Sequence, residues 1–196
     1  MNITQEWAYL TLSDWRGQMG SATGISELGK VMQLAFVPAD FDAAVAHWTQ
    51  VMGVGPFFLM EGIHLEGMKY KGEPTDAVFD LALAYWGDIQ IELIRPRDAH
   101  PSIYTGEYAN VDDGLHHVCI LVDDMQKARA VCADQGAEIV IEGNLGATKV
   151  IYVDPGQGPG SLVEILEQDP NGPDLFGMIK QAGEGWDGAE PIRTLG

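Results

Sequence analysis

The pattern of apolar and polar residues along the chain occurs twice. Residues 33–40 and residues 117–124 each begin with a polar residue, continue as an apolar run typical of a β-strand, and end at an aspartate. A helical pattern follows in both copies, with apolar residues spaced to share one face. These residues are Phe41, Ala44, Val45 and Trp48 in the first copy and Met125, Ala128, Val131 and Cys132 in the second. The repeat predicts a strand and then a helix in each half of the chain.

Both predicted helices have suitable residues at their ends. Aspartate accepts hydrogen bonds from the first helical turn, and glycine adopts the left-handed backbone that commonly ends a helix. The candidates are Asp40 or Asp42 and Asp123 or Asp124 at the N-termini, and Gly53 and Gly136 at the C-termini.

Three β-rich runs separated by turn residues follow each helix. They are residues 55–67, 77–88 and 89–96 after the first helix, and residues 137–143, 148–155 and 161–169 after the second. The sequence therefore predicts an α+β fold of paired βαβββ modules. The expected boundaries are an N-terminal extension at 1–29, a first module at 30–95, a linker at 96–113, a second module at 114–168, and a C-terminal extension at 169–196 that contains a short helix.

Four polar residues interrupt the apolar strands at equivalent places in the two copies. They are Gln33, Glu92, His117 and Glu164, one in the first and one in the last strand of each module. Alternation along a strand places a polar residue among inward-pointing apolar ones, which is costly unless the residue has a partner. If the modules pack as a pseudo-pair, the four side chains converge in one cleft. A divalent cation would then offset the repulsion between the two carboxylates.

The charge and composition of the chain argue against nucleic acid and membranes as binding partners. The chain has 196 residues and a formal net charge of −18, which repels nucleic acid and anionic membranes. It has no apolar run long enough to span a membrane, no signal-peptide pattern at its start, and only two cysteines, so we expect a cytoplasmic protein. A coenzyme A thioester would need a basic patch, and only Lys69 with Lys71 and Arg95 with Arg97 cluster.

The segments "QLAFVPADFDAAVAHW", "IELIRP", "GLHHVCILVDD" and "VDPGQGPGSLVEILE" resemble the vicinal oxygen chelate superfamily, which includes glyoxalase I, methylmalonyl-CoA epimerase, extradiol dioxygenases and antibiotic-resistance proteins. The resemblance covers about residues 31–168. It implies the glyoxalase/bleomycin resistance/dioxygenase fold, with curved mixed sheets around a metal cleft, and a homodimer. It also implies that Gln33, Glu92, His117 and Glu164 bind one divalent metal ion, with zinc first and nickel, cobalt, manganese, magnesium or iron as alternatives.

The resemblance and the strand phase together choose between the two adjacent histidines. Relatives with a His-His pair use the second histidine as the ligand, and alternation places His117 on one face with Cys119 and Leu121. His116 is then expected behind the site or on the surface, and the opposite phase would reverse the two roles. A Gln-Glu-His-Glu set is similar to that of some zinc glyoxalases I. Epimerases of the family usually have histidine where this chain has Gln33.

This ligand set implies an enzyme that acts through a metal-stabilised enolate on a small carbonyl or hydroxycarbonyl substrate, as an isomerase, epimerase or lyase. By analogy with glyoxalase I, Glu164 is the first candidate for the catalytic base and Glu92 the second. One alternative is a small-molecule binding or resistance protein without catalysis. An extradiol-type dioxygenase fits less well, since its facial triad needs two histidines and one carboxylate.

Several further residues are candidates for the substrate pocket. Phe57, Phe58 and Trp86 can line an aromatic wall, and Arg95 can pair with a substrate carboxylate. Asp80 interrupts an apolar strand, where it is either an additional acid or base or a residue that faces a turn or solvent. Cys119 is expected to be a small buried hydrophobic residue without a catalytic role.

Overall fold

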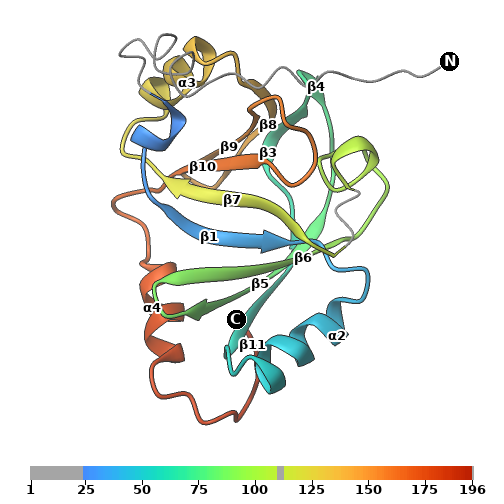
Figure 1. The fold of residues 1–196 in the computed structure, drawn as a ribbon, viewed down its shortest axis with the longest axis vertical. Helices are drawn as coiled ribbons and strands as arrows, with labels where there is room; N and C mark the ends of the chain where they lie inside the picture. The colour runs from blue at the N-terminus through green and yellow to red at the C-terminus, as the bar shows by residue number, and fades with distance from the viewer. Residues whose placement is uncertain (1–23, 110–112, 196) are drawn as a thin grey trace, which may run out of the picture.

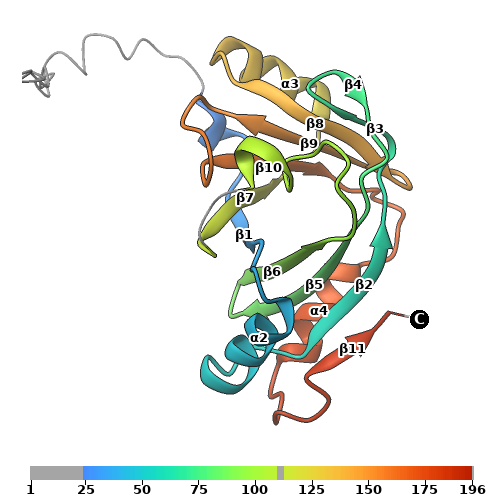
Figure 2. The ribbon, with the colours of Figure 1, turned by 90° about the vertical axis from the view of Figure 1, so that its right-hand side faces the viewer.

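A computed structural model of the chain describes residues 24–109 and 113–195. Most of the expected N-terminal extension lies outside the described residues. Within these described residues, eleven strands form one sheet in the order β11-β2-β5-β6-β1-β7-β10-β9-β8-β3-β4. Figures 1 and 2 show that this sheet curves strongly, with α2 on the outside of one half and α3 on the outside of the other.

The two halves of the sheet have the same connectivity. The first half consists of β1 (Val31–Phe36), α2 (Phe41–Ala46), η2 (His47–Val51), β2 (Phe57–Ile63), β5 (Phe79–Trp86) and β6 (Ile89–Pro96). The second consists of β7 (Leu115–Leu121), α3 (Met125–Asp134), β8 (Glu138–Leu145), β9 (Thr148–Asp154) and β10 (Leu162–Glu167). In each half the first strand pairs in parallel with the last, and antiparallel pairs complete the order. The predicted α+β fold of paired βαβββ modules is confirmed.

The helix ends use the residues that suit them chemically. Asp40 accepts a hydrogen bond from the Ala43 N–H at 2.9 Å, and Asp124 accepts from the first turn of α3. The first helix continues past α2 as the π-helical turn η2 and ends before Gly53, whose φ is +66°. Gly136 has a φ of +70° just beyond α3. Only a residue without a Cβ adopts this backbone region at low cost.

Three short strands extend the sheet beyond the two βαβββ modules. The run predicted at 55–67 divides near Leu65, because β2 stays in the first half whereas β3 (Glu66–Tyr70) pairs with β8 of the second half. A short strand, β4 (Glu73–Pro74), then pairs with β3. At the opposite edge, β11 (Ile192–Thr194) pairs in parallel with β2. The chain therefore crosses between the halves four times, after β2, β4, β6 and β10, and β2 and β3 follow one another along one side of the fold (Figure 2).

Packing against the two faces of the sheet separates an outer core from an inner one. Phe41 of α2 lies in one buried cluster with Phe57 and Ile91, and Met125 of α3 lies in the corresponding outer cluster of the second half. The helix α4 (Leu175–Gly183) instead covers part of the inner face, where Ile179 is fully buried in a cluster with buried Phe58 and Leu83.

The turn-rich segment between the modules also enters the core. It contains η3 (Gly106–Tyr108), and Ile103, Tyr104 and Tyr108 are buried in the inner cluster. The short helix η1 (Ile25–Glu27) precedes β1. Within the described part of the chain, no helix has the length and apolar character needed to cross a membrane.

Candidate metal centre

Four central strands place the polar residues on two neighbouring rungs of the sheet. Ala35 of β1 lies opposite Glu92 of β6 on one side and opposite His117 of β7 on the other. On the next inward-facing rung, Gln33 lies opposite Cys119, which in turn lies opposite Glu164 of β10. Because residues two apart on a strand share a face, this register brings the side chains together. The small side chain of Ala35 leaves room between Glu92 and His117.

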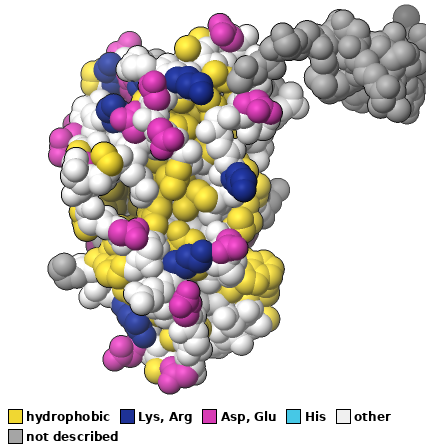
Figure 3. All heavy atoms as spheres, turned by 90° about the vertical axis from the view of Figure 1, so that its left-hand side faces the viewer, with side chains coloured by type: hydrophobic (Ala, Val, Ile, Leu, Met, Phe, Trp, Pro, Cys, Tyr) yellow, Lys and Arg dark blue, Asp and Glu magenta, His cyan; other side chains and the backbone are white. Residues whose placement is uncertain are grey.

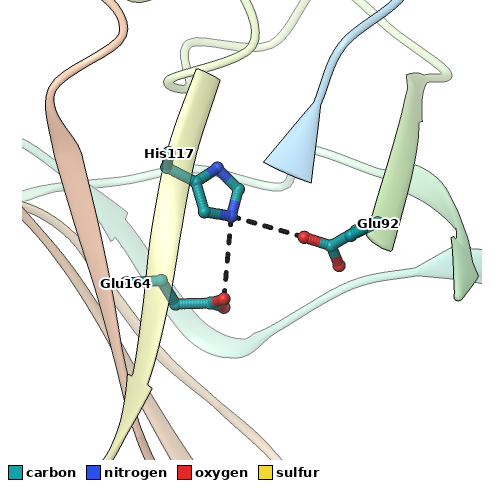
Figure 4. Close-up of side chains that lie close together, drawn as sticks. All are labelled: Glu92, His117 and Glu164. Carbon is teal, nitrogen blue, oxygen red and sulfur yellow. Dashed lines mark ion pairs between the residues drawn. The ribbon is translucent and has the colours of Figure 1, made fainter. Parts of the chain in front are cut away.

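Three of the predicted ligands form one buried cluster (Figure 4). One ligand atom from each of Glu92, His117 and Glu164 lies within 4.8 Å of the other two. His117 Nε2 is 3.3 Å from Glu92 Oε2 and 3.6 Å from Glu164 Oε2. Two carboxylates and one imidazole that converge in this way suit a divalent cation.

His116 fixes the orientation and tautomer of His117. Its Nδ1 is 2.9 Å from His117 Nδ1, and its Nε2 is 3.1 Å from the backbone oxygen of Ile103. That oxygen only accepts hydrogen bonds, so His116 Nε2 carries the proton that it donates, and neutral His116 then accepts at Nδ1. His117 Nδ1 must therefore donate. The lone pair of neutral His117 is left on Nε2, which faces the two carboxylates.

The carboxylates of Glu92 and Glu164 favour a positive charge at or beside His117 Nε2. Burial lowers the pKa of His117, but the carboxylates of Glu164 and Glu92 outweigh this and raise the pKa to about 9. Burial, together with repulsion from Glu164, raises the pKa of Glu92. Burial, with the nearby charge of His117, lowers the pKa of His116 to about 3 and keeps it neutral. Either a proton or a metal ion therefore balances the carboxylates at this point.

Unpartnered buried atoms show that the donor set fits a metal ion. Gln33 Oε1, Glu92 Oε2 and His117 Nε2 are buried and make no hydrogen bond among the described residues, although the last two lie 3.3 Å apart as an ion pair. Gln33 donates from Nε2 to Gln90 Oε1 at 2.7 Å, which leaves its Oε1 available as an acceptor. Buried polar atoms normally have a partner, and metal coordination is one way to supply it. The residues present therefore fit a divalent metal ion.

A cavity of about 940 Å³ opens onto the cluster. Gln33, Glu92 and Glu164 contribute to its lining, together with Tyr152 of β9. The Tyr152 ring packs edge-on against His117, with centroids 5.0 Å apart. The cavity is large enough for a small-molecule ligand, and it gives such a ligand access to the candidate metal ligands.

The four residues predicted to bind substrate do not line this cavity. Strand alternation places three of them on the outer face: Phe57 packs beneath α2, Trp86 meets Trp48 and is 55% exposed, and Arg95 lies over the ring of Phe41. Phe58 does face inward, but α4 covers it. Arg95 is three residues from Glu92 in one strand, so the two side chains must point to opposite faces.

Asp80 is neither exposed nor part of the cavity lining. Its buried carboxylate accepts hydrogen bonds from Arg95 and Arg97 at 2.6 to 2.9 Å and from the Gly62 N–H at 2.9 Å. Burial raises the pKa of Asp80, but these hydrogen bonds and charges outweigh it and hold the pKa below its usual value. Asp80 is a structural anchor for the two arginines on the outer face.

Several residues of the site were missed from the sequence. Tyr152 is one polar position in an apolar strand, and alternation from Val150 would have placed it inward. Leu175 and Phe176 of α4 also line the cavity, but nothing in their sequence indicates which surface the helix covers. The backbone oxygen of Ile103, which holds His116, comes from the segment predicted to be a linker.

Comparison with known proteins agrees with this architecture. Residues 32–153 match a family model described as the Glyoxalase/Bleomycin resistance protein/Dioxygenase superfamily. No curated protein matches the chain significantly. A hypothetical protein from Bacillus halodurans is similar in structure, with a TM-score of 0.51 and 15% identity over 74% of this chain and 99% of that one.

A variant of Streptomyces coelicolor methylmalonyl-CoA epimerase, in complex with 2-nitronate-propionyl-CoA, is also similar. Its TM-score is 0.50 at 19% identity, over 73% of this chain and 96% of the epimerase. Such low identities establish a shared fold and not a shared reaction. The family match extends over most of the described chain, and the repeated βαβββ topology agrees with it. The chain therefore belongs to the Glyoxalase/Bleomycin resistance protein/Dioxygenase superfamily.

Proposed function

We propose that the protein is a metal-dependent isomerase, epimerase or lyase that removes a proton next to a carbonyl group of a small substrate. The observation that carries the proposal is the buried Glu92-His117-Glu164 cluster, with its unpartnered ligand atoms, at an accessible cavity. Gln33 would complete the set, so that one amide oxygen, one imidazole nitrogen and two carboxylates hold the ion. A divalent metal bound there supplies Lewis-acid polarisation of the substrate oxygens.

The residues of the chain would remove the proton, hold the metal ligands in position and exclude water. Glu164 is the proposed base and Glu92 the second candidate, because both carboxylates line the cavity where a substrate carbon would lie. His117, held by His116, keeps its position and its tautomer. The apolar wall excludes water from the carbon that loses its proton. The donor set offers one histidine and two carboxylates, which does not match the triad of two histidines and one carboxylate expected for a dioxygenase.

Metal content and proton exchange test the proposal. We expect roughly one divalent ion per chain in the wild type, by elemental analysis, and a large loss in His117→Ala. The zinc-loaded protein should exchange the proton next to the carbonyl of an α-hydroxyketone in deuterated water, as followed by NMR. Glu164→Gln should abolish exchange, while the control Glu138→Gln, at an exposed position of β8, should retain it.

Two results would contradict the proposal in different ways. If the wild type takes up no ion after reconstitution with zinc, nickel and manganese, the metal-centred mechanism is wrong. A protein that binds metal but catalyses no exchange across a panel of hydroxyketones would instead support a binding protein without catalysis. We also propose a homodimer, which light scattering of the purified protein tests directly.

A further inference from the structure

We infer that the cavity selects an uncharged or cationic, largely apolar substrate and excludes anionic substrates such as coenzyme A thioesters. This inference rests on the proposed function and names the substrate class of the same site. The residues along the cavity change in character from its metal end to its mouth. Each zone interacts with a different part of a bound molecule.

The inner end of the cavity is polar and sparsely hydrogen-bonded. Gln33 is 2% exposed and Glu92 is 5% exposed, and each has an unpartnered oxygen. Oxygen atoms of a substrate belong at this end, where a metal ion between these side chains would receive them. The polar head of the substrate must therefore enter first.

The middle of the cavity is apolar. Side chains from both halves of the sheet and from α4 form this zone: Phe79, Leu81, Leu83, Val150, Leu166 and Phe176. None of these side chains can pair with a charge or hydrogen-bond a polar group. A substrate gains affinity here by burying a hydrocarbon or ring portion, so a compact polar triose would leave most of the wall without contacts.

The mouth carries acidic side chains. Asp123 follows β7, Glu167 is the last residue of β10, and Asp169 and Asp174 lie on the connection from β10 to α4. Glu167 is paired with Lys149 at 2.6 Å, whereas Asp169 and Asp174 have only backbone N–H groups as partners among the described residues, and no lysine or arginine. Among the described residues that line the cavity, there is no lysine or arginine.

The surface around this mouth does not supply a cationic patch. Figure 3 shows the face on the side of the connection from β10 to α4, where apolar side chains gather centrally and charges of both signs surround them. Lys149 and Lys180 are paired with Glu167 and Asp88. Arg95 and Arg97 are held by Asp80. A substrate with phosphate groups would thus place them beside carboxylates, within a chain of net charge −18.

Three hydroxamates that share one chelating head and one alkyl chain test the inference. Octanohydroxamate has a neutral far end, and its two analogues end in an ammonium group or a carboxylate. Titrated into the zinc-loaded protein at low salt, the carboxylate analogue should bind about tenfold more weakly than the neutral one, and the ammonium analogue at least as tightly. Asp123→Lys should restore several-fold of the lost affinity. Asp134→Lys, the same charge change at an exposed position of α3, should leave it unchanged.

The outcomes separate this inference from the proposed function. Equal affinity for all three probes, or displacement of octanohydroxamate by acetyl coenzyme A, would overturn the substrate class and leave the metal site intact. Absence of binding by every probe, or binding that survives Glu92→Gln and His117→Ala undiminished, would overturn the metal-centred site and the inference with it.

Discussion

Removal of the His116 side chain should weaken metal binding although His116 is not a ligand. His116 and His117 are both fully buried, and their Nδ1 atoms are 2.9 Å apart. In His116→Leu, the His117 Nδ1–H loses its acceptor. The proton can then move to Nε2, which is the atom that must bind the ion. His116→Asn places an amide oxygen near the former Nδ1 position and should retain part of the interaction.

The size of the effect follows from the geometry. Loss of a hydrogen bond that orients a metal-binding histidine typically reduces metal affinity by about tenfold to a hundredfold, or about 1.4 to 2.7 kcal/mol. His116 itself donates from Nε2 to the Ile103 backbone oxygen at 3.1 Å, and this hydrogen bond fixes its orientation. The buried N–H of His117 would also be left unsatisfied, at a cost of about 1 to 3 kcal/mol. We therefore expect the upper part of the range.

Competition with a zinc-chelating dye measures this affinity directly. The order of affinity should be wild type, then His116→Asn, then His116→Leu, with His117→Ala below all three. His47→Ala removes an exposed imidazole from η2 and serves as the control. A His116→Leu protein that folds and binds zinc within twofold of the wild type would refute the role assigned to His116.

Three further changes test other parts of the structure. Ala35→Leu fills the gap between Glu92 and His117, so zinc affinity should fall by more than about a hundredfold, whereas Ala35→Gly should retain it. Asp80→Asn removes the partner of two arginines and should cost about 2 to 3 kcal/mol at pH 7 in urea unfolding. The pKa of Asp80 is lower in the folded protein than in the unfolded chain. The stabilisation that Asp80 provides is therefore present above the unfolded pKa of about 4 and is lost as pH falls through the folded pKa. The difference in unfolding free energy between the wild type and Asp80→Asn should shrink in acid. Ile179→Ala leaves a void beneath α4 and should destabilise the protein by about 2 to 4 kcal/mol. An unchanged urea midpoint would show that α4 does not pack on the sheet as described.

Strand alternation explains both what could and what could not be predicted about the site. Counting in twos from Glu92 and His117 correctly separates inner from outer positions, because buried strands keep a regular pleat. The same count along β6 places Arg95 outside, and alternation along β5 from Leu83, which lies opposite Glu92, places Trp86 outside, although their chemistry had suggested a pocket role. Local periodicity therefore carries more information about the orientation of a side chain than its functional groups do.

Contacts between distant segments could not be read from local patterns. β3 leaves the first half to pair with β8, and its partner is set by the register of the whole sheet. Ile103 lies in a turn-rich segment, yet its backbone oxygen holds His116. The sequence of α4 shows an apolar face, but only the folded chain shows that this face covers Phe58 and Leu83.

The antiparallel pairing of β1 with β7 joins the two halves of the sheet. Each half contributes two of the four candidate ligands. Gln33 and Glu92 belong to one half, and His117 and Glu164 to the other. Neither half alone can offer more than two ligands, so neither would hold an ion firmly as an isolated fragment. A bound ion would cross-link the two halves at this point, in addition to the backbone hydrogen bonds between β1 and β7. The duplicated sequence thus builds a site that only the pair possesses.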